Sequence, residues 1–145
     1  MDVSVFEAQA DTINVDDITT NSNNRIVLKR IKRNADDDYN ELCIQHRHYQ
    51  NGEDCVDYVP EGAYDMGWLG YFVGKNEHLR ELYICPSTLT SEASVRNVME
   101  PFYRGISNNR SIRGIYFTNT NILEGEIFTM LGSFFQNNHN LTSIH

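Results

Sequence analysis

The sequence predicts an α/β fold in which short parallel strands line one face and helices line the other. Three stretches, 66–84, 99–117 and 128–145, align without an internal gap, and a fainter copy precedes them at 27–44. Each stretch starts with apolar residues at helical spacing and ends with apolar residues that alternate with polar ones. Repeated units of this kind stack into a solenoid, in which each unit buries its apolar face against its neighbours.

The first half of each copy predicts a helix with one apolar stripe. Residues three and four positions apart lie on the same side of a helix, so a set at i, i+3 and i+4 forms a single buried face. The positions are Leu69, Phe72 and Val73 in one copy, Phe102 and Ile106 in the next, and Leu131, Phe134 and Phe135 in the last.

The second half of each copy predicts a short strand with one buried face. The alternating apolar positions are Leu79, Leu82 and Ile84, then Ile112, Ile115 and Phe117, then Leu141 and Ile144, with Tyr39, Leu42 and Ile44 in the fainter copy. Because helical crossovers join successive strands, the strands should be parallel. Leu82, Ile115 and Ile144 should then form one row, and Tyr83 should lie beside Tyr116.

An asparagine separates the two halves of each copy, at Asn76, Asn109 and Asn138. Asparagine tolerates the left-handed backbone that commonly ends a helix, so we expect these residues to end the three helices. Gly74 and Gly105 lie close by and add helix-ending character.

The strand segments resemble the leucine-rich-repeat family, in particular its longer, ribonuclease-inhibitor-like repeats. Residues 79–84 fit the signature L-x-x-L-x-L, as do 112–117 and 141–144. The resemblance covers residues 25–145 and implies about four units. It implies a leucine-rich-repeat solenoid, a partial horseshoe with parallel strands on the concave face and helices on the convex face, open or truncated at the C-terminus. It further implies a protein-recognition scaffold that docks its partner on the concave face.

Residues between the buried strand positions should point towards that concave face. Tyrosine and arginine are frequent interface hot spots, which favours the neighbouring pairs Tyr83–Tyr116 and Arg80–Arg113. Alternatively, the tyrosines only stabilise the sheet by cross-strand packing. The predicted protein-binding residues are Glu41, Cys43, Arg80, Glu81, Tyr83, Arg113, Tyr116, Thr118, Ser143 and His145.

The charge of the chain argues against nucleic-acid binding. All of the net charge of −8 falls in residues 1–65, which contain 14 acidic and 6 basic side chains, whereas residues 66–145 contain 6 of each. Phosphate-backbone binding needs clustered cations. The basic run 25–33 could be an import signal or a nucleic-acid patch, but we favour the solvated face of an amphipathic helix.

The cysteines and the N-terminus indicate an intracellular, cytoplasmic protein without membrane association. Cys43, Cys55 and Cys85 are odd in number and predict no disulfide framework. The N-terminus lacks a secretory pattern, and no apolar run approaches ~18 residues. Residues 1–24 contain few large apolar groups and predict a flexible acidic lead before the repeat domain at 25–145.

No pattern of residues indicates catalysis. Cys43, His46, His48 and Cys55 do not have the usual spacing of zinc ligands, so an ordinary loop is favoured. The histidines lie in no recognisable triad motif, and no strand leads into a glycine-rich phosphate loop. We expect no metal, no cofactor and no enzymatic activity.

The function predicted from the sequence is therefore a non-catalytic protein–protein interaction module. One alternative is a fragment or degenerate repeat protein without an independent ligand, and another is a substrate-recruiting adaptor arm of a larger assembly. Trp68 could anchor a partner, but its helical register favours the core. An uncapped last strand would leave an open edge, which predicts possible self-association there.

Overall fold

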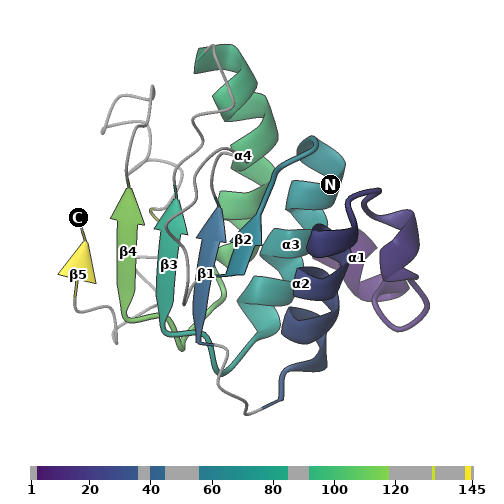
Figure 1. The fold of residues 1–145 in the computed structure, drawn as a ribbon, viewed down its shortest axis with the longest axis horizontal. Helices are drawn as coiled ribbons and strands as arrows, with labels where there is room; N and C mark the ends of the chain where they lie inside the picture. Colours follow the sequence, from purple (N-terminus) through teal and green to yellow (C-terminus); the bar gives the residue numbers. More distant parts are fainter. Residues whose placement is uncertain are drawn as a thin grey trace.

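The computed structural model describes residues 3–35, 40–44, 56–84, 92–117, 132 and 143–144. These residues form a five-stranded parallel sheet with helices packed on one face (Figure 1). The strands are β1 (Glu41–Ile44), β2 (Val56–Tyr58), β3 (Glu81–Ile84), β4 (Gly114–Phe117) and β5 (Ser143–Ile144). The helices are α1 (Val3–Gln9), the 3-10 turn η1 (Val15–Asp17), α2 (Ser22–Arg33), α3 (Ala63–Lys75) and α4 (Glu92–Ile106).

The order of the strands corrects the predicted solenoid. In a solenoid each new strand adds on the same side, whereas the order here is β2-β1-β3-β4-β5. Strand β2 comes from the segment that the sequence treats as a connection, and it pairs on the outer side of β1. Within the described residues the chain forms a single sheet covered by helices and no solenoid, so the prediction of a leucine-rich-repeat horseshoe is wrong.

The packing of the helices gives a physical reason why the predicted horseshoe does not form. A horseshoe curves because its helices are wider than the spacing of its strands. Helices α3 and α4 approach each other backbone to backbone. A Cβ added at Gly70 would lie only 2.6 Å from the carbonyl oxygen of Phe102. A Cβ at Gly105 would lie 2.7 Å from the backbone nitrogen of Tyr71. The glycines thus serve close packing, and Gly105 lies within α4 rather than ending it.

The register of strand pairing was predicted correctly. Leu82 pairs with Ile115, and Ile115 pairs with Ile144. Leu82 also pairs with Leu42 of the fainter copy. The alternation of apolar and polar residues fixes this register, because a slip by one residue would turn every buried side chain to the opposite face.

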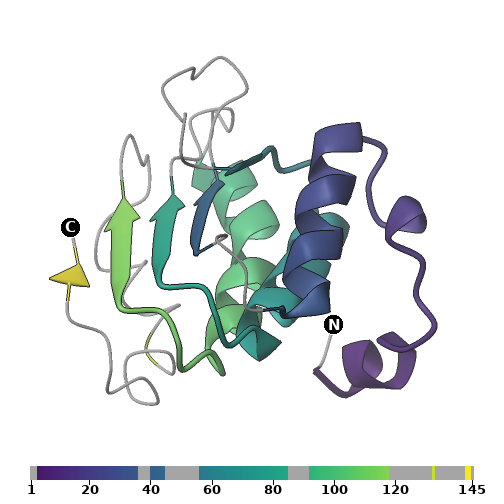
Figure 2. The same cartoon turned by 60° about the horizontal axis from the view of Figure 1, so that its bottom comes forward.

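The core lies between the sheet and the helix layer, as the turned view in Figure 2 shows. Strand residues Leu42, Leu82 and Ile115 have no exposed surface and belong to the same cluster as the apolar stripes of the helices. Trp68 is also fully buried, which confirms the prediction that it belongs to the core. Val27, Leu28 and Ile31 form the buried stripe of α2, whereas Lys29, Lys32 and Arg33 are exposed, as predicted for the basic run.

The beginning of the chain differs from the flexible lead that the sequence predicts for residues 1–24. From residue 3 onwards this segment folds into α1, η1 and the start of α2. Phe6 is 7% exposed and packs edge-on against Trp68, with ring centroids 4.8 Å apart. Val15 and Ile18 are buried in the same core. Phe6, Val15 and Ile18 therefore anchor the acidic N-terminal segment to the core.

Asn76 ends α3 as the sequence predicts, but it lacks the predicted left-handed backbone. Asn76 has φ −72° and ψ 137°, an extended conformation, whereas Asn34, which follows α2, is left-handed with φ 53°. Asn76 and Asn109 are instead buried, and their side chains bond to the backbone of neighbouring units. Asn138 lies outside the described residues.

Cys43 is disulfide-bonded, whereas the sequence predicts no disulfide framework. Among the helices of the described residues, none has the length and apolar character needed to cross a membrane.

Candidate functional site

The face of the sheet opposite the helices has a pair of tyrosines at its centre. Tyr83 of β3 and Tyr116 of β4 are paired in the register, and their rings stack with centroids 4.6 Å apart and planes 12° apart. Both side chains are half-buried. Because Leu82 and Ile115 point to the core, the alternation of the strands turns these two rings away from it. The predicted neighbour relation is therefore confirmed.

Two glutamates lie beside the tyrosine stack. Glu41 and Glu81 are partners in the β1–β3 pairing, and both are half-buried. The Glu81 carboxylate occupies the space above Gly114, where a Cβ would collide with its Oε2 atom. This oxygen is buried and accepts no hydrogen bond within the described part of the chain. Gly114 thus leaves room for the Glu81 carboxylate, a feature that the sequence did not reveal.

The glutamates also affect the tyrosines. Burial raises the pKa of Tyr83 above its ordinary value, and the neighbouring Glu41, Tyr116 and Glu81 raise it further. Two aromatic rings and two carboxyl side chains therefore share this face. We call the surface formed by Glu41, Glu81, Tyr83 and Tyr116 the tyrosine face.

The two predicted arginines lie elsewhere. Arg80 and Arg113 are neighbours, since the backbone nitrogen of Arg113 donates to the carbonyl oxygen of Arg80 at 2.7 Å. They immediately precede β3 and β4, so they lie at the amino-terminal edge of the sheet. The Arg80 Nη1 atom donates to the carbonyl oxygen of Glu77 at 3.1 Å and reaches that of Ser111 at 3.5 Å. The structure therefore separates the arginines from the tyrosine face.

The remaining predicted residues are only partly placed. Cys43 pairs with Tyr83 in the register but is 6% exposed and disulfide-bonded, so it offers little surface. Ser143 pairs with Gly114, which places its backbone in the row of Glu41 and Glu81. Thr118 and His145 lie outside the described residues, as do His46, His48 and Cys55.

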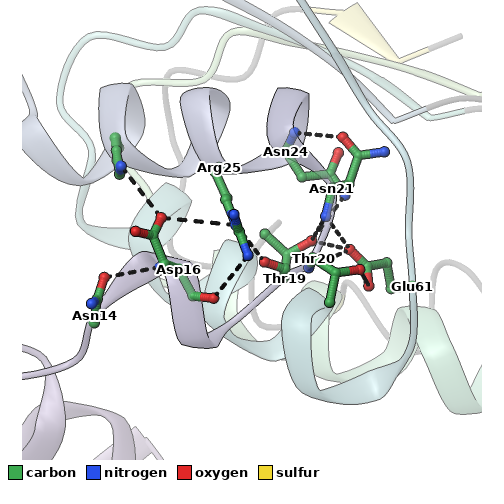
Figure 3. A network of polar contacts seen from close by, with 9 residues as sticks. Asn14, Asp16, Thr19, Thr20, Asn21, Asn24, Arg25 and Glu61 are labelled. Atoms are coloured by element: carbon green, nitrogen blue, oxygen red, sulfur yellow. Dashed lines mark hydrogen bonds and ion pairs between the residues drawn. The ribbon is translucent and has the colours of Figure 1, made fainter.

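A second polar cluster joins the start of α2 to the segment before α3 (Figure 3). The Glu61 carboxylate accepts hydrogen bonds from the hydroxyls of Thr19 and Thr20 and from the backbone nitrogens of Thr20 and Asn21. Burial acts to raise the pKa of Glu61, but the hydrogen bonds outweigh it and lower the pKa. A carboxylate satisfied by four donors at a helix start is a structural cap.

The same region contains exposed ion pairs. Asp16 lies 3.8 Å from Arg25 and 3.4 Å from Lys29 (Figure 3). Exposed pairs of this kind contribute little, roughly 0–1 kcal/mol each. They hold the cations of α2 on its solvated face and form no chemical site.

A buried carboxyl–phenol pair caps α3. Asp65 accepts hydrogen bonds from the backbone nitrogens of Gly62 at 2.7 Å and Glu61 at 3.1 Å, and from the Tyr58 hydroxyl at 2.8 Å. Burial raises the pKa of Asp65 although these bonds oppose the change, and burial together with Asp65 raises the pKa of Tyr58. Both groups are satisfied inside the core, so the pair stabilises the helix start.

Among the described residues, the tyrosine face combines aromatic rings with carboxylates, a composition suited to recognition. No group of three or more His, Cys, Asp or Glu side chains among them is placed to hold a metal ion. The chain matches no model of a known protein family, and no curated protein sequence matches it. The resemblance to leucine-rich repeats stays a prediction from the sequence.

Proposed function

We propose that this protein is not an enzyme and binds a basic segment of a partner protein on the tyrosine face. The observation that carries the proposal is the stack of Tyr83 on Tyr116 with two half-buried glutamates beside it. Such a surface combines aromatic area with concentrated negative charge, and it lies opposite the helices (Figure 2).

The chemistry of these groups favours an arginine or lysine of the partner. A guanidinium group stacks on tyrosine rings and forms paired hydrogen bonds with carboxylates. Glu41 and Glu81 add two half-buried carboxylates beside the rings, and a hydrogen bond to a charged group contributes about 1.5–3 kcal/mol.

The net charge of −8 supports a basic partner as well. Complementary charge raises association rates and disfavours acidic competitors. The alternative is that the tyrosine pair only strengthens the sheet, for which cross-strand pairs contribute about 0.2–1 kcal/mol. This alternative predicts a stability effect of the tyrosines without any effect on binding.

A peptide-display selection on the immobilised protein separates the two possibilities. We expect the wild type to select peptides rich in arginine or lysine, and the double variant Tyr83→Ala, Tyr116→Ala to lose them. Tyr64→Ala is the matched control, since Tyr64 is 49% exposed on α3. In direct titration with a selected peptide, Glu81→Gln should weaken binding about tenfold, or about 1.4 kcal/mol. Selection of acidic peptides, or equal binding by the double variant, would contradict the proposal.

A further inference from the structure

The strand at one edge of the sheet is β2, and α2 packs beside it (Figure 1). An edge strand presents a row of backbone N–H and C=O groups away from the sheet, and such a row pairs readily with another chain. The link 59–62 follows β2 directly and leads from this edge to α3. The partners of its backbone groups therefore decide whether a further strand can add there.

Asn24, in the first turn of α2, takes the place of a neighbouring strand at Val59. Its Nδ2 atom donates to the carbonyl oxygen of Val59 at 2.7 Å, and its Oδ1 atom accepts from the backbone nitrogen of Val59 at 3.0 Å. A residue of an antiparallel neighbour would form the same pair of bonds, because an amide side chain has the donor and acceptor of a peptide group. Asn24 has no exposed surface, so both bonds are shielded from water.

The direction of these bonds identifies the outward residues of β2. In an extended chain the N–H and C=O groups of one residue point to one side, and those of the next residue point to the other. Because the groups of Val59 point to Asn24, those of Tyr58 point to β1 and those of Asp57 point outwards. Asn24 thus occupies one of the two outward residues between 56 and 59, and a single remaining residue is too short an edge for a strand.

The rest of the link is closed by other means. Pro60 has no backbone N–H to offer to an added strand. The backbone nitrogens of Glu61 and Gly62 donate to the carboxylate of Asp65 at 3.1 Å and 2.7 Å. From Val59 to Gly62, each residue therefore either lacks an N–H group or directs it to a side chain of the same molecule.

We propose that Asn24 closes this edge of the sheet against a second copy of the chain, and that without Asn24 the β2 strands of two copies pair. The partner is a second copy because both copies present the same two outward residues, which allows a two-fold symmetric, antiparallel pair. Val27, Leu28 and Ile31 fix α2 in the core, so the helix holds Asn24 firmly at the edge. This inference is independent of the tyrosine face and of the function proposed for it.

The test is sedimentation velocity of the full chain over a range of concentrations. We expect Asn24→Ala to self-associate at least about tenfold more tightly than the wild type. Asn109→Ala is the matched control, because Asn109 is equally buried and also bonds to backbone groups, but next to the inner strand β4. Equal association of the two variants would show general destabilisation and overturn the proposal. Association of Asn24→Ala no tighter than that of the wild type would overturn it as well.

A double variant locates the contact between the copies. Asn24→Ala combined with Val59→Pro leaves no N–H group at residues 59 and 60, so it should return to the behaviour of the wild type. Association as tight as that of Asn24→Ala alone would place the contact on another surface and contradict the proposal. Should Asn24→Ala not fold, as judged by circular dichroism, Asn24→Ser and Asn109→Ser give the same comparison with a hydroxyl in place of the amide.

Hydrogen exchange in the wild type tests the closed edge without any substitution. The amide of Val59 should exchange with solvent more slowly than that of Asp57, because Asn24 accepts its hydrogen bond inside the protein. Faster exchange at Val59 than at Asp57 would contradict the closure of the edge by Asn24.

Discussion

Asn109 repeats, one unit further along the sheet, the hydrogen bonds of Asn76. Its Nδ2 atom donates to the carbonyl oxygen of Val73 in α3 at 2.7 Å, as Asn76 donates to that of Ile31 in α2 at 3.1 Å. In both cases Oδ1 accepts from the backbone nitrogens two and three residues further on, each at 2.8 Å. Each side chain thus fixes its own link and ties it to the preceding helix.

We expect Asn109→Ala to lower the free energy of unfolding by about 2–4 kcal/mol, because it leaves several buried backbone groups without partners. Urea denaturation followed by circular dichroism measures this change. Asn108→Ala is the control, since Asn108 is exposed and should change stability by less than about 0.5 kcal/mol. Similar denaturation midpoints for the two variants would show that the asparagine bridges contribute little.

Gly70→Ala should destabilise the protein by more than about 2 kcal/mol, because the new methyl group meets the backbone of α4 rather than a movable side chain. The measurement is the shift in Tm and in the urea midpoint. Gly62→Ala provides the control, as nothing lies within 4 Å of the added carbon there. Equal Tm values and urea midpoints for Gly70→Ala and Gly62→Ala would contradict the close approach of α3 and α4.

The two buried tyrosines should respond in opposite ways to loss of their hydroxyls. Tyr58→Phe removes the donor to Asp65 and should cost about 1–3 kcal/mol. Tyr103→Phe should be neutral or stabilising by up to about 1 kcal/mol, because its buried hydroxyl has no hydrogen bond within the described residues. Chemical denaturation at neutral pH measures both, and a larger loss for Tyr103→Phe would contradict the assignment.

The two buried tyrosines, Tyr58 and Tyr103, predict that the stability of the protein falls at alkaline pH. Burial raises the pKa of both Tyr58 and Tyr103 in the folded protein. A phenol whose pKa is higher in the folded than in the unfolded protein contributes its full stability below the unfolded pKa of about 10. This contribution is lost as the pH rises from there towards the folded pKa. Tyr103→Phe should therefore flatten the fall in stability above pH ~10, measured as the free energy of unfolding across the alkaline range. An unchanged alkaline profile for Tyr103→Phe would count against its burial.

Reduction should destabilise the protein through Cys43. The chain has three cysteines and Cys43 is disulfide-bonded, so one free thiol is expected in the unreduced, unfolded protein. Adding a reductant should lower stability by about 2–4 kcal/mol, and Cys43→Ser should abolish the response. A count of three free thiols before reduction would show that the bond does not form.

The strand register was predictable because it depends on a local pattern. Alternation around Leu82 and Ile115 specifies which side chains are buried, and that places Tyr83 beside Tyr116 without further information. Strand β2 was missed because three residues, Val56–Tyr58, are too few to show a period. Its position depends on the pairing with β1 and on the bond between Tyr58 and Asp65, neither of which is a local property.

The sequence predicted the position of the tyrosine pair but not that of the arginines. The alternation of β3 and β4 turned Tyr83 and Tyr116 to one surface, and the L-x-x-L-x-L signature placed Arg80 there as well. The carbonyl oxygens of Glu77 and Ser111 draw Arg80 to the edge instead. Alignment of the copies does signal that the two arginines are neighbours, since Arg113 takes the position of Arg80.

The sequence by itself determined which residues of β1, β3 and β4 face the core and in what register these strands pair, because apolar periodicity acts over a few residues. The tertiary structure alone decided the existence and place of β2 and the docking of Phe6 on Trp68. These features arise from contacts between segments far apart in the chain, and their free energy depends on fit between surfaces that no local pattern encodes.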